Sequence, residues 1–147
     1  MLKGIHPLLH PELLHALASM GHGDEIVIAD ANFPSASIAT RLIHVAAASS
    51  ADVLSAVLTL LPLDTDLATA AVTMKVISDN SAIPEAVKEF AAVLKAHEVP
   101  GAKLASTERS AFYARAREAF AVVRTADMRP YANILLVKGV VNRYPTG

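Results

Sequence analysis

The feature of this sequence that most constrains its fold is an alternation of short apolar runs with longer segments of helical periodicity. The short runs resemble strands buried within a sheet, and the longer segments place apolar residues on one helix face. Alternating strands and helices are typical of layered α/β proteins. We therefore predict a three-layer, Rossmann-like α/β domain with a largely parallel central sheet.

The ends of the predicted elements carry recognisable signals. Gly21 is predicted to end the first helix as a C-terminal glycine cap, and Ser106 or Thr107 to cap the last one. Helices are predicted over 11–20, 50–61 and 108–119 and from Pro84 onward, and strands over 25–29, 41–45, 70–76, 121–123 and 134–137.

The composition favours one domain over residues 1–147. Hydrophobic residues make up 53% of the chain and charged residues 18%, which is enough apolar material for a continuous core. Thirteen Lys+Arg against fourteen Asp+Glu is the wrong balance for a protein whose main work is holding nucleic acid. The chain has no cysteine, which excludes disulfides, thiolate nucleophiles and cysteine-rich metal sites.

Nothing in the sequence predicts a membrane partner or secretion. The most apolar stretch, 53–63, is interrupted by Ser55, Thr59 and Pro62 and is far shorter than the roughly 20 residues of a membrane span. The first residues contain no long apolar run before a small-residue cleavage site. A cytoplasmic protein is therefore expected.

Histidines are frequent, but their spacing gives little support to a metal site. His10 and His15 are five residues apart rather than the four of a helical zinc pair, and without cysteine such a site would need carboxylates from elsewhere. No metal is expected. Four of the histidines are interpreted as solvated or capping residues: His10, His15, His44 and His97.

His22 differs from the other histidines because it lies between two glycines, at the junction of the first helix and the first strand. The glycines leave the imidazole uncrowded and permit unusual backbone angles. An imidazole gives and takes protons near neutral pH, which suits general acid–base chemistry. The alternative is an idle, hydrogen-bonded turn histidine, and the local sequence alone favours that alternative.

Two aspartates stand where the local sequence is consistent with either a ligand contact or a turn. Asp30 follows the first predicted strand, and ligands of open α/β sheets bind beyond the carboxyl ends of strands. Its carboxylate could accept hydrogen bonds from the hydroxyls of a sugar or polyol or orient a histidine, and an Asx turn is equally consistent with the local sequence. Asp64 is similarly ambiguous, and the turn is favoured there.

Two further pairs of polar residues could address a ligand together. Arg109 and Tyr113 are four apart on the last predicted helix and hence share a face. Tyr131 and Asn133 are two apart in a segment leading into a strand, so they could point the same way. The chain has no Gly-rich phosphate loop and no G-x-S-x-G elbow, so nucleotide-dependent enzymes and serine hydrolases are poorly supported.

Several motifs follow one another along nearly the whole chain. They are Met20-Gly21-His22-Gly23-Asp24-Glu25, Ala29-Asp30-Ala31-Asn32-Phe33-Pro34, Leu61-Pro62-Leu63-Asp64, Glu108-Arg109 with Phe112-Tyr113-Ala114-Arg115-Ala116, and Tyr131-Ala132-Asn133 leading to Lys138-Gly139-Val140. In this combination the chain resembles the L-fucose mutarotase and D-ribose pyranase family, and within it the fucose branch.

The resemblance implies a sugar isomerase that uses no cofactor and takes a monosaccharide as its substrate. It implies that His22 is the proton donor and that Asp30 binds the sugar. It also implies a homo-oligomer, from dimer to decamer, with sites near subunit interfaces. The remaining residues that it places around the sugar, some from an adjoining subunit, are Asp64, Arg109, Tyr113, Tyr131 and Asn133.

The chain departs from the family pattern at two places. Ala132 stands where the family usually has glycine between the tyrosine and the asparagine, and its methyl could narrow the approach to the sugar. The stretch 45–50 lacks the Ala-Asp-Gly that fucose-type members often carry. The preferred sugar therefore stays open, with D-ribose pyranase or a non-catalytic sugar-binding transport accessory as alternative functions.

Overall fold

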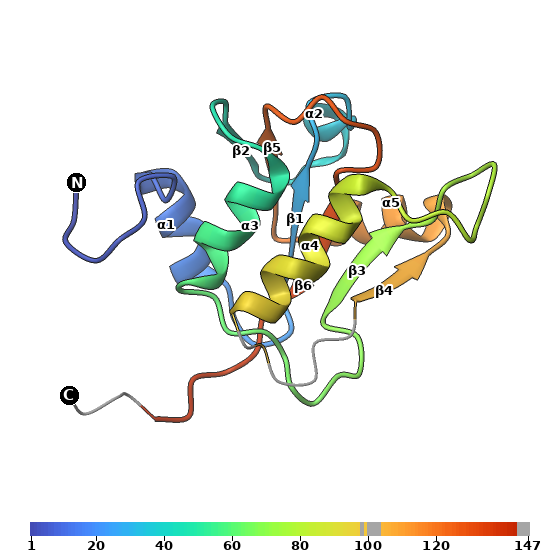
Figure 1. The fold of residues 1–147 in the computed structure, drawn as a ribbon. Coiled ribbons are helices and arrows are strands. Elements are labelled where there is room, and N and C mark those ends of the chain that lie inside the picture. The colour runs from blue at the N-terminus through green and yellow to red at the C-terminus, as the bar shows by residue number, and fades with distance from the viewer. Residues whose placement is uncertain (98, 100–103, 144–147) are drawn as a thin grey trace.

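A six-stranded mixed sheet forms the centre of the protein, with the strand order β2-β5-β1-β6-β3-β4 (Figure 1). The structure, a computed structural model, describes residues 1–97, 99 and 104–143. The strands are β1 (Glu25–Ala29), β2 (Leu42–Val45), β3 (Ala71–Met74), β4 (Leu104–Thr107), β5 (Ala121–Thr125) and β6 (Ile134–Val137). The helices within the described residues are α1 (Pro11–Ser19), α2 (Ser35–Ile38), α3 (Ser50–Leu58), α4 (Glu85–Ala96) and α5 (Arg109–Glu118).

The strands are largely parallel, as predicted. β1 and β2 both pair in parallel with β5, and β3 pairs in parallel with β4. β6 lies antiparallel between β1 and β3 and is the one reversed strand of the described sheet. The loop 126–133 explains this reversal. A strand parallel to β5 would have to start at the same end of the sheet as β5, and this loop is too short to carry the chain back there. Consequently β6 begins at the end of the sheet where β1 terminates.

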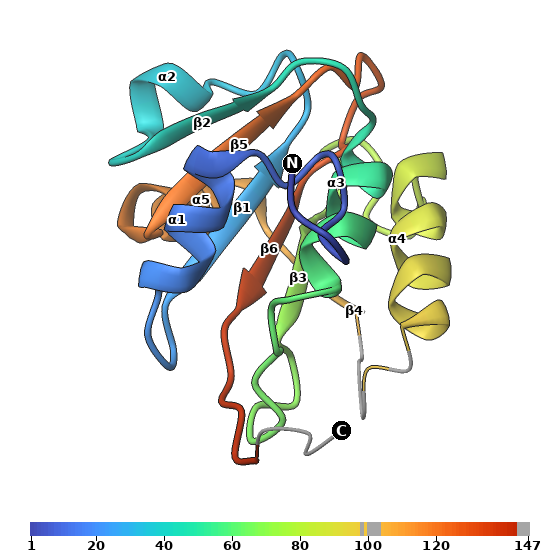
Figure 2. The ribbon, with the colours of Figure 1, turned by 90° about the vertical axis from the view of Figure 1, so that its left-hand side faces the viewer.

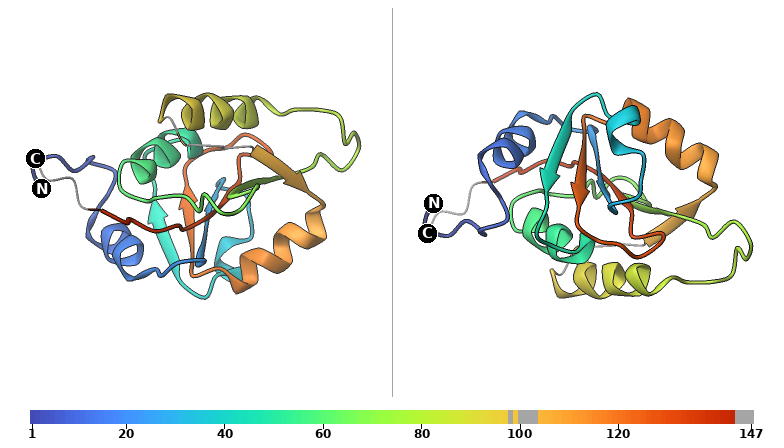
Figure 3. Two further views of the ribbon diagram at one scale, coloured as in Figure 1. Left: turned by 90° about the horizontal axis from the view of Figure 1, so that it is seen from below. Right: turned by 90° about the horizontal axis from the view of Figure 1, so that it is seen from above.

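Helices cover both faces of the sheet, which confirms the three-layer α/β architecture (Figure 2). Ile26 and Ile28 of β1 face the core that contains α1, α3 and α4, whereas Val27 and Ala29 face the core that contains α2 and α5. Seen from below and above, α3 and α4 lie on one side of the strands and α5 on the other (Figure 3). Phe90 and Phe112, both 0% exposed, fill the two cores. Burial of one such side chain stabilises the fold by about 1.5–3 kcal/mol.

Two short elements were missed by the sequence analysis. β4 covers Leu104–Thr107, so Ser106 and Thr107 are strand residues and the prediction that one of them caps α5 is wrong. Glu108 occupies that cap position instead. β4 is short and contains one large apolar residue, which leaves no clear alternation in its sequence. The other missed element is the four-residue helix α2.

The end of α1 also differs from its prediction. Met20 is the C-cap residue and has an extended backbone, and Gly21 does not adopt a left-handed conformation. The glycine that does so is Gly23, with φ +85°. The carbonyls at the end of α1 therefore need another partner, which Lys138 supplies. Among the described residues, no helix is both long enough and apolar enough to cross a membrane.

Candidate active site

The expected site residues fall into two groups at opposite ends of β1. His22 lies in the turn before this strand, and Asp30 directly follows its last residue. Five strand residues span roughly 16 Å. In Figure 2 the turn between α1 and β1 lies at the lower end of the sheet and the end of β1 at the upper end. One chain therefore does not bring His22 to Asp30, and the suggestion that Asp30 orients the imidazole is wrong within a single chain.

A cleft of about 280 Å³ lies at the upper end. It contains five of the residues that the sequence analysis singled out: Asp30, Arg109, Tyr113, Tyr131 and Asn133. They come from the end of β1, from α5 and from the loop before β6. The sequence analysis did not assign a site role to the remaining lining residues, which are Asn32, Phe33, Met74, Ile77 and Pro130.

Asp30 forms a turn and lines the cleft at the same time. Its Oδ1 accepts hydrogen bonds from the backbone N–H of Asn32 at 2.9 Å and of Phe33 at 2.8 Å. Its own backbone N–H donates to Oδ1 of Asn133 at 2.8 Å. Both readings of Asp30 are thus compatible, because the turn uses Oδ1 and no described residue hydrogen-bonds to Oδ2. The carboxylate and the Asn133 amide together offer an acceptor and donors to a polyhydroxylated ligand.

Arg109 and Tyr113 share one face of α5, as their spacing predicts. The Arg109 guanidinium carbon lies 5.0 Å from the centre of the Tyr113 ring, a cation–π contact. The Tyr113 ring packs edge-on against Phe33, with ring centres 5.2 Å apart. No described carboxylate forms an ion pair with Arg109, so its donors are available at the mouth of the cleft. Phe33 and the tyrosine ring give the cleft an apolar wall beside its polar groups.

Tyr131 adopts a left-handed backbone, with φ +59°. This conformation is strained for a bulky residue and is retained only where its surroundings hold it. Its hydroxyl accepts a hydrogen bond from the backbone N–H of Ile77 at 3.2 Å. Ala132 is 0% exposed and belongs to the core on the α1, α3 and α4 side of the sheet, and it does not line the cleft. The expectation that its methyl narrows the approach to a sugar is therefore wrong.

A partly buried ion pair supports this loop. The Arg129 guanidinium donates to both carboxylate oxygens of Asp127, at 3.0 Å and 2.9 Å, and also to Glu89 on α4. Asp127 accepts a further bond from the backbone N–H of Ser50 at the start of α3. The hydrogen bond from Arg129 is the main reason that the pKa of Asp127 is lowered, although burial opposes the shift. The loop that carries Tyr131 is thereby tied to two helices.

At the other end of β1, Nε2 of His22 lies 3.0 Å from Oδ2 of Asp64. The His22 side chain is 52% exposed and that of Asp64 8%. The backbone N–H of Asp66 donates to Oδ1 of Asp64 at 2.9 Å, which confirms the predicted turn. This hydrogen bond lowers the pKa of Asp64 most, and the contact with His22 lowers it further against the effect of burial. The Asp64 carboxylate therefore acts as a charged hydrogen-bond acceptor that holds the imidazole in place.

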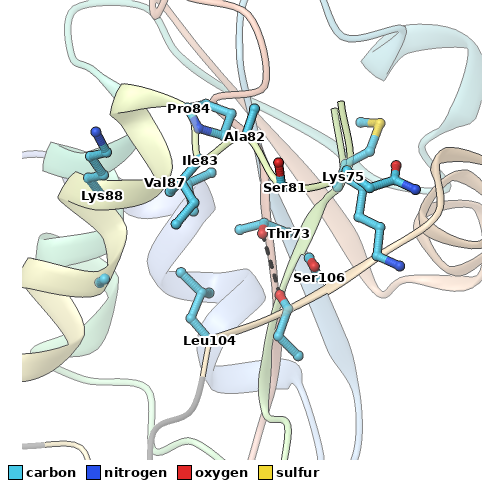
Figure 4. Close-up of a pocket in the computed structure, with 14 residues that line it drawn as sticks. Thr73, Lys75, Ser81, Ala82, Ile83, Pro84, Val87, Lys88, Leu104 and Ser106 are labelled. Carbon is cyan, nitrogen blue, oxygen red and sulfur yellow. Dashed lines mark hydrogen bonds between the residues drawn. The ribbon is translucent and has the colours of Figure 1, made fainter. Parts of the chain in front are cut away.

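A larger hollow, of about 540 Å³, lies between α4 and the β3–β4 edge of the sheet (Figure 4). Val87 and Leu104 line it, together with Thr73, whose hydroxyl donates to the carbonyl of Ala105 at 3.4 Å. None of the expected site residues lines this hollow. The smaller cleft is the better candidate, because polar groups from three segments converge there.

Metal ligands do not gather among the described residues, where no group of three or more His, Asp or Glu side chains is placed to hold an ion. His6 and His10 are four apart in sequence, the spacing of a helical pair, but both precede α1. Nδ1 of His10 caps α1 by accepting from the backbone N–H of Leu13 at 3.5 Å, which confirms its capping interpretation. The same ring contacts the carbonyl of His44 through Nε2 at 2.9 Å.

Known proteins with similar sequences and structures match nearly the whole chain. The chain is 39% identical over 140 residues to an L-fucose mutarotase of Actinobacillus pleuropneumoniae, covering 95% of this chain and 97% of the relative. A crystal structure of the fucose mutarotase of Streptococcus pneumoniae in complex with L-fucose is 39% identical, covers 95% of this chain and 99% of that one, and superposes with a TM-score of 0.89.

A third protein shares the fold at lower identity. RbsD of Bacillus subtilis, solved in complex with D-ribose, is 23% identical, covers 96% of this chain and 99% of that one, and superposes with a TM-score of 0.73. The model of the RbsD / FucU transport protein family matches residues 3–141. The chain belongs to the RbsD / FucU family.

Proposed function

We propose that this protein is a sugar mutarotase that interconverts the α and β anomers of L-fucose or a closely related monosaccharide. The observation that carries the proposal is the full-length similarity to fucose mutarotases, one of them solved with L-fucose. We assign proton transfer to the His22–Asp64 pair and sugar binding to the residues of the cleft. The reaction oxidises nothing, so it calls for no redox cofactor. We propose that residues 1–147 act as one domain; the cytoplasmic location stays a prediction.

The proposed reaction opens and recloses a hemiacetal ring. His22 donates a proton to the ring oxygen while the anomeric hydroxyl loses one, so the C1–O5 bond breaks and an aldehyde forms. Rotation about the bond to C1 exposes the other face of the carbonyl, and the reverse proton movements close the ring as the other anomer. A water held by Asp64 or Tyr113 is the proposed base. Since sugars open spontaneously, the roughly 10²–10⁴-fold gain typical of general acid–base groups is sufficient.

Substrate binding is assigned to the cleft. Oδ2 of Asp30 and the amide of Asn133 face it without competing side-chain partners among the described residues, and Arg109 adds donors at its mouth. Tyr131 is proposed to hold the pyranose as well. The apolar rings beside these groups suit the C–H faces of a sugar.

We further propose that a complete site forms between two copies of the chain. Within one chain, β1 separates the His22–Asp64 pair from the cleft, so the pair can reach only the cleft of another copy. Exposed apolar residues occur near both ends, with Leu60 and Val141 beside the segment that carries Asp64, and Ile77 at the cleft. Repeated head-to-tail contacts of this kind form a ring when the rotation between copies closes, whereas a two-fold dimer would contain two such sites.

The proposal is tested by saturation-transfer NMR of anomer exchange with L-fucose, D-galactose and D-ribose. Acceleration of L-fucose exchange by the protein, abolished in His22→Ala, is expected. His44→Ala, which removes another exposed imidazole, is the matched control and should exchange L-fucose at the normal rate. No acceleration for any of these sugars contradicts the proposal, and saturable sugar binding without acceleration would indicate a binding accessory. Faster exchange of D-ribose between its pyranose and furanose forms would indicate a pyranase.

A further inference from the structure

The end of α1 is capped by Lys138, a residue more than 100 positions further along the sequence. The Lys138 ammonium donates to the carbonyl of Leu17 at 2.8 Å and to that of Met20 at 2.5 Å. Carbonyls in the last turn of a helix have no intrahelical partner, and a cation is favoured there by the helix dipole. Gly21 does not provide a left-handed cap, so Lys138 fixes the point at which the chain leaves α1 and enters the His22 turn.

The backbone of Lys138 holds the other side of the same turn. Its carbonyl accepts from the N–H of Gly23 at 2.8 Å, and its N–H donates to the carbonyl of Asp24 at 2.9 Å. Within the turn itself, the N–H of Gly21 donates to the Asp24 carboxylate at 2.7 Å. Lys138 thus contacts the residues before His22 through its side chain and those after it through its backbone.

The same segment also holds Asp64. The N–H of Asp64 donates to the carbonyl of Val137 at 3.0 Å, and the N–H of Gly139 donates to the carbonyl of Pro62 at 2.8 Å. A Cβ at Gly139 would lie 2.4 Å from the carbonyl oxygen of Leu63, so these two segments approach closely enough to require glycine. Lys138 therefore stands between the segment that carries His22 and the segment that carries Asp64.

We infer that Lys138 is a positioning residue of the proposed mutarotase, whose ammonium holds the His22 turn where the imidazole meets the Asp64 carboxylate. The inference rests on the proposed function and extends it to a residue that does not line the cleft. The backbone contacts of Lys138 persist whatever its side chain is. Its ammonium is accordingly the part that a substitution can remove selectively.

The kinetic test compares Lys138→Met, Lys138→Arg and Lys95→Met. Methionine keeps the apolar stem and removes the donors, and Lys95, in the last turn of α4, offers the same change at a helix end that does not contact the turn. In Lys138→Met we expect a roughly ten- to hundredfold lower maximal exchange rate, because misplacing a reacting group by about 1 Å can cost up to about a hundredfold in rate. KM should stay within about twofold, since the cleft is untouched. Lys138→Arg should restore most of the rate, and Lys95→Met should not change it.

A second readout needs no sugar. The ¹⁵N chemical shifts of the His22 imidazole report its tautomer and its hydrogen bond to Asp64, and Lys138→Met should change both while the assembly measured by size exclusion stays intact. An unchanged rate or an unchanged His22 spectrum in Lys138→Met overturns the inference. So does a joint change of KM and assembly, which indicates a merely structural lysine. If the wild-type protein accelerates no sugar, the proposed function fails, whereas the spectrum still decides whether Lys138 positions His22.

Discussion

The side-chain oxygen of Asn133 accepts a hydrogen bond at 2.8 Å from the backbone N–H of Asp30, a residue 103 positions away. This contact joins the start of β6 to the end of β1, and it exists because the reversed β6 begins where β1 ends. It fixes which atoms of the asparagine face the cleft. The oxygen is occupied by the backbone, so the amide N–H groups are left to donate to a ligand.

Asn133→Asp is therefore expected to weaken sugar binding. The carboxylate can still accept from the backbone of Asp30, but it offers no donor and places a second negative charge beside the Asp30 carboxylate. We expect KM for L-fucose to rise roughly tenfold, which corresponds to about 1.4 kcal/mol, with a smaller effect on the maximal rate. Exchange rates measured over a range of sugar concentrations check this. The exposed Asn142→Asp is the control, and equal KM values for the two variants would contradict the assignment.

Asp64→Asn is expected to lower the maximal rate rather than sugar affinity. The asparagine can still accept from the imidazole, but its neutral amide oxygen is a weaker acceptor than the Asp64 carboxylate and holds the ring less firmly. We expect a loss of roughly 10²-fold, the lower end of what a general acid contributes. Asp66→Asn is a matched control, since only the backbone of Asp66 contacts Asp64. A rate equal to that of the wild-type protein would remove Asp64 from the mechanism.

Ala132→Gly tests whether the methyl of this residue shapes the sugar site. The methyl is fully buried in the core and does not line the cleft. Its loss, together with the added backbone freedom of glycine, should lower the free energy of unfolding by about 1.5 kcal/mol. The ratio of exchange rates for L-fucose and D-ribose should not change. A changed ratio would mean that Ala132 does shape the sugar site.

The sequence predicts long periodic elements and residue types, but not which distant residues meet. α1, β1, β2 and β6 were predicted within a residue or two, because their apolar patterns are clear and their ends carry proline, glycine or polar residues. β4 was missed because four residues with one large apolar side chain carry almost no periodicity. The pairing of His22 with Asp64 depends on how β6 and the segment 62–64 lie together, which no local pattern encodes.

Charge at Asp127 should make stability depend on pH. Its pKa in the folded protein lies below the ordinary value of 3.8, chiefly because of the hydrogen bond from Arg129. Because the folded-state pKa is lowered, the ionised Asp127 stabilises the fold fully above about pH 4. This stabilisation is lost as pH falls through the folded-state pKa. Asp127→Asn should lower the free energy of unfolding by about 2 kcal/mol at pH 7, since it weakens bonds to a charged partner.

Urea denaturation from pH 7 to pH 3, at one fixed protein concentration, measures this dependence. The difference between the wild-type protein and Asp127→Asn should shrink below pH 4. Asp52→Asn, at an exposed position in the first turn of α3, serves as a control. A difference that stays constant over the whole range would mean that the ion pair contributes no pH dependence.

The proposed sharing of one site between two copies is tested by mixing two inactive variants. His22→Ala lacks the proton donor but keeps an intact cleft, and Asp30→Asn has the donor but a damaged cleft. After the subunits are unfolded together and refolded, some contacts pair the intact His22 of one copy with the intact cleft of another. With random assembly in equal amounts, about a quarter of the sites contain both wild-type halves, so about a quarter of the wild-type exchange rate should return. If each chain used its own His22 and its own cleft, mixing would restore no activity, and the site would have to form within one chain.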